Sequence, residues 1–269
     1  MNTNKNSYTF IYASIVVIIV AFLLAFVSSA LHDRQQKNID LDKQKHILAS
    51  LNIFEKDAAA AYDKYITAEQ LLNADGSVAC TDEGCAFACS TAEIAEKLPV
   101  YIASVDGDTK YIFPLKGQGL WGPIYGYLSL NSDKQTVCGV DFTHDSETPG
   151  LGAEITNRAK FQVPFQGKKL VRDGAIALSV VKNGNVKDAD YEIDGLSGAT
   201  FTSTGVSNML NDVLSLYLPY LGQGAATPCK DTASCGHDEG ECGNHAEGEC
   251  DHACAGTAAC GHCNETANE

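Results

Sequence analysis

A run of mainly apolar residues without a single charge extends from Tyr8 to Leu31. A helix that crosses a bilayer needs about 20 such residues, and this run provides them. A cleaved signal peptide is the alternative, since the small residues from Ser28 to Ala30 would suit cleavage, but signal peptides usually have only about 7–15 apolar residues. We therefore expect a short segment at 1–7 and a retained transmembrane helix at 8–31.

The charge of the chain is strongly negative. Its 269 residues carry a formal net charge of −15. A nucleic-acid-binding protein needs a basic face against the phosphates, so we expect no nucleic-acid partner. The length suffices for one sizeable core with additional segments.

The last segment, 223–269, is acidic and rich in cysteine and histidine. From Cys229 onward it holds seven Cys, four His, nine acidic residues and one Lys. Because it has few large apolar side chains, we expect a disordered tail. Thiolates and imidazoles bind soft metals, so a metal site there is an open alternative. Its candidate ligands are Cys260, Cys263, His252 and His262.

Residues 32–97 follow the apolar run. We expect a juxtamembrane helix around Ile39 to Ile53 and a second helix over 58–72, which begins with four alanines. A loop with Cys80, Cys85 and Cys89 comes next. Its cysteine spacing fits neither zinc nor iron–sulfur patterns, which favours a surface loop, with or without a disulfide, over a metal site.

Residues 98–222 have the pattern of an α+β domain. A helix is predicted after the strands, because apolar residues recur at three- and four-residue spacing from Val206 to Tyr217. Strands followed by one long helix predict a mainly antiparallel sheet with flanking helices. The predicted strands are 99–105, 110–115, 125–130, 136–142 and 175–181.

The segment from Asp194 to Thr204 is rich in hydroxyl residues and immediately precedes the apolar pattern of the helix. We expect Ser203 or Thr204 to cap that helix, which would leave Thr200 in a tight turn before it. A helix N-terminus has free N–H groups and the positive end of the dipole, so it stabilises a phosphate. An ordinary Ser/Thr-rich turn is the other interpretation.

Two more stretches resemble turns when read alone. Gly119 to Gly126 reads Gly-Leu-Trp-Gly-Pro-Ile-Tyr-Gly and holds the only tryptophan, and Glu147 to Gly152 reads Glu-Thr-Pro-Gly-Leu-Gly. Together with Asp-Gly-Leu-Ser-Gly-Ala-Thr at 194–200, in this order, they resemble the FMN-binding domain family. Within it, they are similar to the C subunits of Na+-translocating NADH:quinone reductases. The resemblance covers about residues 5–222 and not the tail, and it implies an FMN-binding domain at 98–222.

The resemblance implies a set of cofactor-binding residues and no catalytic residue. FMN would be attached through a phosphoester to the hydroxyl of Thr200 by a separate flavin transferase, and Asp194 would matter for recognition by that transferase. Backbone groups of Ser197, Gly198 and Ala199 would surround the phosphate. The residues implied around the isoalloxazine are Glu147, Thr148, Gly150 and Leu151, with Trp121 close by.

The resemblance also implies an electron-relaying subunit of a membrane complex that oxidises NADH, reduces quinone and exports Na+. The chain has no Gly-x-Gly-x-x-Gly after a strand, so we do not expect it to bind NADH itself. The G subunit of Rnf-type electron transport complexes shares the 147–152 stretch and is an alternative. A membrane protein that binds metal through its tail is another.

Orientation in the membrane is implied by the resemblance and opposed by charge. The resemblance implies a single-pass protein of the bacterial inner membrane with its FMN domain on the periplasmic side. Lys5 before the apolar run and Arg34 and Lys37 after it weakly favour the reverse, because cytoplasmic flanks are enriched in Lys and Arg. We follow the resemblance.

Overall fold

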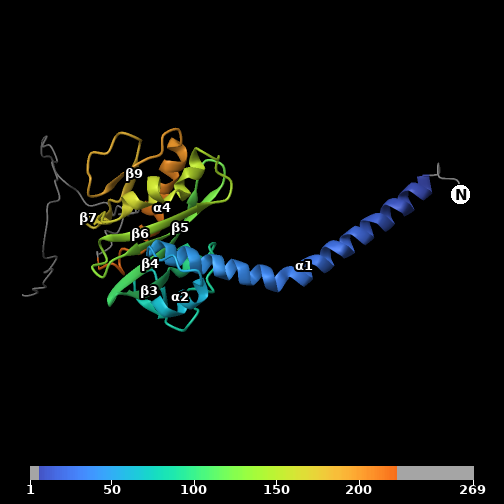
Figure 1. Cartoon of the computed structure of the whole chain (residues 1–269), viewed down its shortest axis with the longest axis horizontal. Coiled ribbons are helices and arrows are strands. Elements are labelled where there is room, and N and C mark those ends of the chain that lie inside the picture. Colours follow the sequence, from blue (N-terminus) through green and yellow to red (C-terminus); the bar gives the residue numbers. More distant parts are fainter. Residues whose placement is uncertain (1–5, 223–269) are drawn as a thin grey trace, which may run out of the picture. The chain divides into compact units, whose positions relative to one another are not determined.

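The structure is a computed structural model, and it describes residues 6–222 (Figure 1). The tail at 223–269, with its metal candidates Cys260, Cys263, His252 and His262, lies outside the described residues. Within residues 6–222, no group of three or more His, Cys, Asp or Glu side chains could hold a metal ion. Cys80, Cys85, Cys89 and Cys138 are free thiols.

One uninterrupted helix, α1 (Asn6–Ser50), contains the predicted membrane span (Figure 1). It is long and apolar enough to cross a membrane, with a mean hydropathy of 3.0 over its most apolar window. The helix rises 1.5 Å per residue, so about 20 residues suffice to cross a hydrocarbon core and the rest of α1 would extend beyond it. The expected juxtamembrane helix is therefore the continuation of the membrane helix.

A six-stranded antiparallel sheet forms the centre of the fold, in the strand order β2-β1-β3-β4-β5-β6. Its last four strands coincide with four of the predicted strands: β3 (Pro99–Val105), β4 (Asp108–Gln118), β5 (Pro123–Leu130) and β6 (Val137–His144). The predicted α+β class with a mainly antiparallel sheet is confirmed.

The predicted helix over 58–72 is wrong in its second half. The helix α2 (Ala58–Tyr65) covers only the first half of this range, and the second half is the strand β1 (Ile66–Leu72). β1 pairs with β3 from Ile66 opposite Ala103 to Leu71 opposite Pro99. Helix propensity is a weak preference, and this pairing overrides it. β2 (Val78–Cys80) and the short α3 (Ile94–Lys97) follow, so two strands of the sheet come before residue 98.

Short elements connect β6 to the last helix. Three helical turns come first, and two small two-stranded ladders follow, of which β9 with β10 is parallel and β7 with β8 is antiparallel. The predicted strand over 175–181 is thus divided between β8 and β9. The elements are η1 (Gly152–Thr156), η2 (Arg158–Gln162), η3 (Val163–Phe165), β7 (Val171–Arg172), β8 (Ala175–Ile176), β9 (Ser179–Val181) and β10 (Glu192–Asp194).

The helix α4 (Thr200–Ser215) covers one face of the sheet. It contacts β4 most closely where Gly117 faces Met209 and where Gly205 faces the carbonyl oxygen of Gln118. Its predicted apolar face is buried, which confirms the helical pattern: Val206, Met209, Leu210, Val213, Leu214 and Tyr217. They join one core with sheet residues such as Phe113, Leu115, Ile124 and Leu128.

The other face of the sheet holds the end of α1 and the helix α2. Ile47, Leu48 and Leu51 are buried there with Tyr101 and Ile112 in a second core. The hydroxyl of Ser129 on β5 donates a 2.7 Å hydrogen bond to the carbonyl of Ser50. The helix that carries the apolar run therefore ends inside the folded domain.

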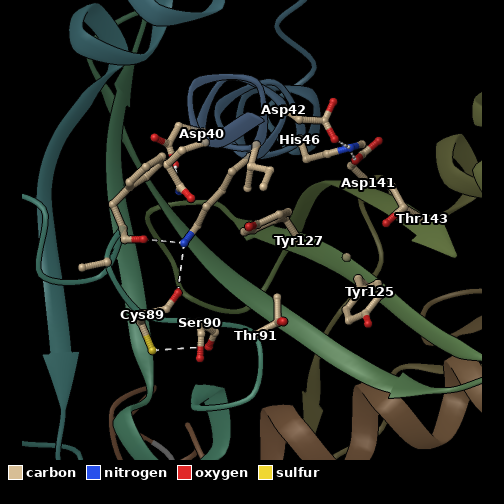
Figure 2. A pocket seen from close by; sticks show the side chains of 16 residues that line it. Asp40, Asp42, His46, Cys89, Ser90, Thr91, Tyr125, Tyr127, Asp141 and Thr143 are labelled. Atoms are coloured by element: carbon tan, nitrogen blue, oxygen red, sulfur yellow. Dashed lines mark hydrogen bonds and ion pairs between the residues drawn. The ribbon is translucent and has the colours of Figure 1, made fainter. Parts of the chain in front are cut away.

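A hollow of about 460 Å³ lies beside this junction, between α1, the cysteine loop and strands β5 and β6 (Figure 2). His46 and Asp141 point toward each other above it, with 2.5 Å between His46 Nδ1 and Asp141 Oδ2. Lys43 donates hydrogen bonds to the carbonyls of Phe87, at 2.6 Å, and Cys89, at 3.0 Å. These contacts tie α1 to the sheet and to the cysteine loop.

The pair of His46 and Asp141 makes the docking of α1 sensitive to pH. The hydrogen bond to Asp141 raises the pKa of His46 despite its partial burial, and the carboxylate of Asp42 raises it further. A raised pKa stabilises the fold fully below the unfolded value of about 6.5, and the stabilisation is lost as the pH rises through the folded value. His46→Ala should therefore lower the free energy of unfolding by about 1 kcal/mol in mildly acidic solution and by less at alkaline pH.

The measurement is denaturant unfolding of the detergent-solubilised chain from mildly acidic to alkaline pH. His32→Ala is the matched control, because His32 is an exposed residue of the same helix. A stability difference for His46→Ala that grows toward alkaline pH would contradict the assignment.

Candidate functional site

The buried carboxylate of Glu147 joins three separate segments of the chain. Its Oε1 accepts a 2.9 Å hydrogen bond from the backbone N–H of Trp121, and its Oε2 accepts a 2.6 Å hydrogen bond from the hydroxyl of Thr202. The N–H groups of Leu120 and Gly122 also face the carboxylate and lower its pKa. The 119–126 stretch, the 147–152 stretch and the start of α4 therefore meet at one side chain.

Two glycines make room for this carboxylate. A Cβ at Gly119 would lie 2.4 Å from Oε1 of Glu147, and a Cβ at Gly152 would lie 2.3 Å from its Oε2. Any larger residue at either position would displace this hydrogen-bonded carboxylate, which favours glycine there. Contact with Glu147 thus explains one glycine in each of the two stretches.

The environment of Glu147 keeps its carboxyl group ionised. Burial alone would raise its pKa, but the hydrogen bonds from Thr202 and from the N–H groups of Trp121, Leu120 and Gly122 lower it below its ordinary value. Only 4% of the residue is exposed. The site therefore contains a fixed negative charge that is neutralised by protein donors.

Helix α4 begins at Thr200, earlier than predicted. The expected N-cap at Ser203 or Thr204 is wrong, because the N–H of Ser203 already makes a helical hydrogen bond to the carbonyl of Ala199, at 2.9 Å. The hydroxyl of Ser203 instead accepts a 3.0 Å hydrogen bond from the N–H of Leu196. Thr200 is thus the first residue of the helix, and the N–H groups of 200–202 have no partner within it.

Hydrogen bonds to the 183–184 turn hold the turn before α4 in place. Asp194 accepts a 2.6 Å hydrogen bond from the N–H of Gly184, and Asn183 donates a 2.8 Å hydrogen bond to the carbonyl of Gly195. Gly198 has a φ of +78°, a conformation that favours glycine. Asp194 therefore has a structural partner in the 183–184 turn.

The hydroxyl groups near the helix start differ in exposure. Thr202 and Ser203 are buried and bonded within the protein, whereas Thr200 and Thr204 are exposed. Thr200 lies at the helix terminus, and Thr204 lies one turn further along. Of the two exposed hydroxyls, only that of Thr200 is beside the unpaired N–H groups.

Large exposed apolar side chains lie on the segments that meet at this helix start. Their exposed fractions are 67% for Trp121, 49% for Leu120, 44% for Leu151 and 73% for Phe201. Leu151 lies against Gly198, since a Cβ there would be 3.0 Å from Leu151 Cδ2. Exposed apolar groups gathered at one place are typical of binding sites. We call Leu120, Trp121, Leu151 and Phe201 the apolar rim.

The remaining predicted residues lie in the same region. Ser197 and Gly198 are exposed in the turn before α4, and Ala199 is buried. Thr148 and Gly150 are exposed, and the carbonyl of Thr148 accepts hydrogen bonds from the N–H groups of Leu151 and Ala153, both at 3.1 Å. Sequence reasoning missed the roles of Leu120, Phe201 and Thr202. For Thr202, the helical spacing to Val206 and Met209 was the available signal that its side chain faces inward.

Comparison with known proteins connects this site to a family. Residues 119–215 match the FMN-binding domain family. The chain is 33% identical over 262 residues to the C subunit of the Na+-translocating NADH-quinone reductase of Pseudomonas aeruginosa, covering 84% of this chain and 99% of that protein. The chain belongs to this family of C subunits.

Other members of the C-subunit family are also similar to this chain. The protein of Vibrio anguillarum is 31% identical over 214 residues, which cover 71% of this chain and 83% of that one. The crystal structure of the C subunit from Parabacteroides distasonis has a TM-score of 0.66 and 42% sequence identity, with 71% of this chain and 96% of that chain covered. The relatives support the C subunit of the NADH-quinone reductase and not the G subunit of the Rnf-type complex.

Proposed function

We propose that this chain is the membrane-anchored flavoprotein subunit of a Na+-translocating NADH:quinone reductase and relays electrons through FMN attached to Thr200. The observation that carries the proposal is the exposed hydroxyl of Thr200 at the first position of α4, inside the Asp-Gly-Leu-Ser-Gly-Ala-Thr motif. Membership of the C-subunit family and the match to the FMN-binding domain family support it.

The helix start offers a place for the phosphate of FMN. In a phosphoester to Thr200, the remaining phosphate charge would lie at the N-terminus of a 16-residue helix. The unpaired N–H groups of residues 200–202 and the helix dipole favour a negative charge there. Ser197, Gly198 and Ala199 would surround the phosphate with backbone groups, and a separate flavin transferase would attach it.

The apolar rim offers a place for the isoalloxazine. Leu151 and Trp121 would cover the ring, and Thr148 and Gly150 would lie beside it. Burying these side chains against a flat aromatic ring removes apolar surface from water, which stabilises the bound ring. The bound FMN would supply the electron-carrying group, while the protein positions it and tunes its environment.

The other subunits of the complex would supply the NADH and quinone sites. Within residues 6–222 this chain offers no cluster of catalytic residues and no dinucleotide motif. Its part in the reaction is therefore to hold the flavin at a defined place among its partners. Covalent attachment would keep the cofactor in place through repeated electron transfer.

We place residues 8–31 in the bacterial inner membrane and the flavin domain on its outer side. An alkaline phosphatase fused after residue 222 should be active in cells, because this enzyme matures only where disulfides form. The same fusion to a chain without residues 1–31 is the control and should be inactive. Activity of a cytoplasmic reporter fused at the same position would contradict this orientation.

Thr200→Ala should abolish covalent flavin while the domain remains folded. The reason is that the substitution removes the attacking oxygen but leaves the buried faces of α4 unchanged. The measurement is flavin fluorescence of the denatured protein band after production together with a flavin transferase. Thr204→Ala is the matched control, since Thr204 is another exposed threonine of α4. Fluorescence that persists in denatured Thr200→Ala would refute the attachment site.

Leu151→Ala should leave the flavin attached but change its surroundings. Loss of the side chain exposes one side of the ring to water, so the visible absorption and the midpoint potential should shift. Leu216→Ala is the control, because Leu216 is similarly exposed, at 40%, and lies at the opposite end of α4. An unchanged spectrum and potential in Leu151→Ala would remove Leu151 from the ring site.

A further inference from the structure

We infer that Glu147 is a positioning residue whose carboxylate fills an anion-binding nest in the 119–122 turn and so fixes that turn against the start of α4. The inference rests on the proposed function, because it explains how the apolar rim and Thr200 come to share one site. It assigns Glu147 to the support of the flavin site and not to contact with the ring.

The 119–122 turn has the form of an anion-binding nest. The N–H of Gly119 bonds to the carbonyl of Gly122 at 2.9 Å, which closes the turn. The next three N–H groups face Glu147: that of Trp121 donates a 2.9 Å hydrogen bond, and those of Leu120 and Gly122 lower the pKa of the carboxyl group. Successive N–H groups that point into one concavity bind anions. Here the anion is a side chain of the same protein.

The second oxygen of Glu147 connects the nest to α4. It accepts the 2.6 Å hydrogen bond from the Thr202 hydroxyl, two residues after Thr200. The backbone of Trp121 and the side chain of Thr202 are thus held by the same carboxylate. Gly119 and Gly152, which have no Cβ, make room for the carboxylate at this position.

Both oxygens of Glu147 are engaged, and the residue is 4% exposed. A ligand on the surface could reach the carboxylate only by displacing Trp121 or Thr202. Removing the carboxylate would leave the N–H of Trp121 and the hydroxyl of Thr202 without their partner, and such groups reorganise toward water. The expected consequence is a loose 119–122 turn, with Trp121 no longer held beside α4.

Trp121 provides a direct readout because it is the only tryptophan of the chain. We suggest measuring acrylamide quenching of its fluorescence in the full-length, flavin-free protein, produced without a flavin transferase. Quenching should increase in Glu147→Ala and, by a smaller amount, in Glu147→Gln, which keeps the volume but has one acceptor oxygen instead of two. The control Glu154→Ala should match the wild type, since Glu154 pairs with exposed Lys160.

Chemical rescue separates a missing anion from a general packing defect. Sodium formate should enter the space left in Glu147→Ala and restore the wild-type quenching in a saturable way, while sodium chloride at equal ionic strength should not. Unchanged quenching in both Glu147 variants would overturn the inference. So would a folded Glu147→Ala protein with increased quenching that formate does not reverse.

The flavin provides a second readout. In the presence of the transferase, Glu147→Ala should carry about tenfold less covalent flavin than the wild type, and formate should restore the yield. Equal yields in Glu147→Ala and the wild type would overturn the inference. If the wild type and Glu154→Ala both lacked covalent flavin, the proposed function would fail, and the Trp121 measurement would still decide the role of Glu147.

Discussion

A single buried charge organises the candidate site. The carboxylate of Glu147 accepts hydrogen bonds from the N–H of Trp121 in the 119–122 turn and from the hydroxyl of Thr202 on α4. Buried charges are tolerated only when protein groups replace the lost water, and here the donors come from two segments far apart in sequence. The tight turn, the two glycines beside the carboxylate and the inward direction of Thr202 all follow from that requirement.

The sheet separates this site from the membrane junction. α4 and the first core lie on one face, while the end of α1 and the second core lie on the other. β6 contributes to both sides, because Phe142 is in the first core and Asp141 bonds to His46 of α1. The domain can therefore be anchored through one face without covering the start of α4 on the other.

Much of the fold could be predicted from the sequence where one pattern is dominant. The apolar run, strands β3–β6 and the buried face of α4 were legible because their periodicity agrees with their final packing. The strand at residues 66–72 could not be predicted in this way, since its pairing with β3 is a contact between segments distant in sequence. The start of α4 was missed because Ser203 bonds to Leu196 instead of capping the helix. The motifs come together at the candidate site, but the inward direction of Glu147 depends on the 119–122 turn, which no local pattern specifies.

The continuity of α1 has a mechanical consequence. From Leu31, at the end of the apolar run, to His46, docked on β6, the helix spans 15 residues, or about 22 Å at 1.5 Å per residue. A flexible tether would let the domain sample many heights and orientations above the bilayer, whereas a helix with intact hydrogen bonds transmits rotation and tilt. The continuous helix thus limits how far the docked end of α1 can move from the end of the apolar run.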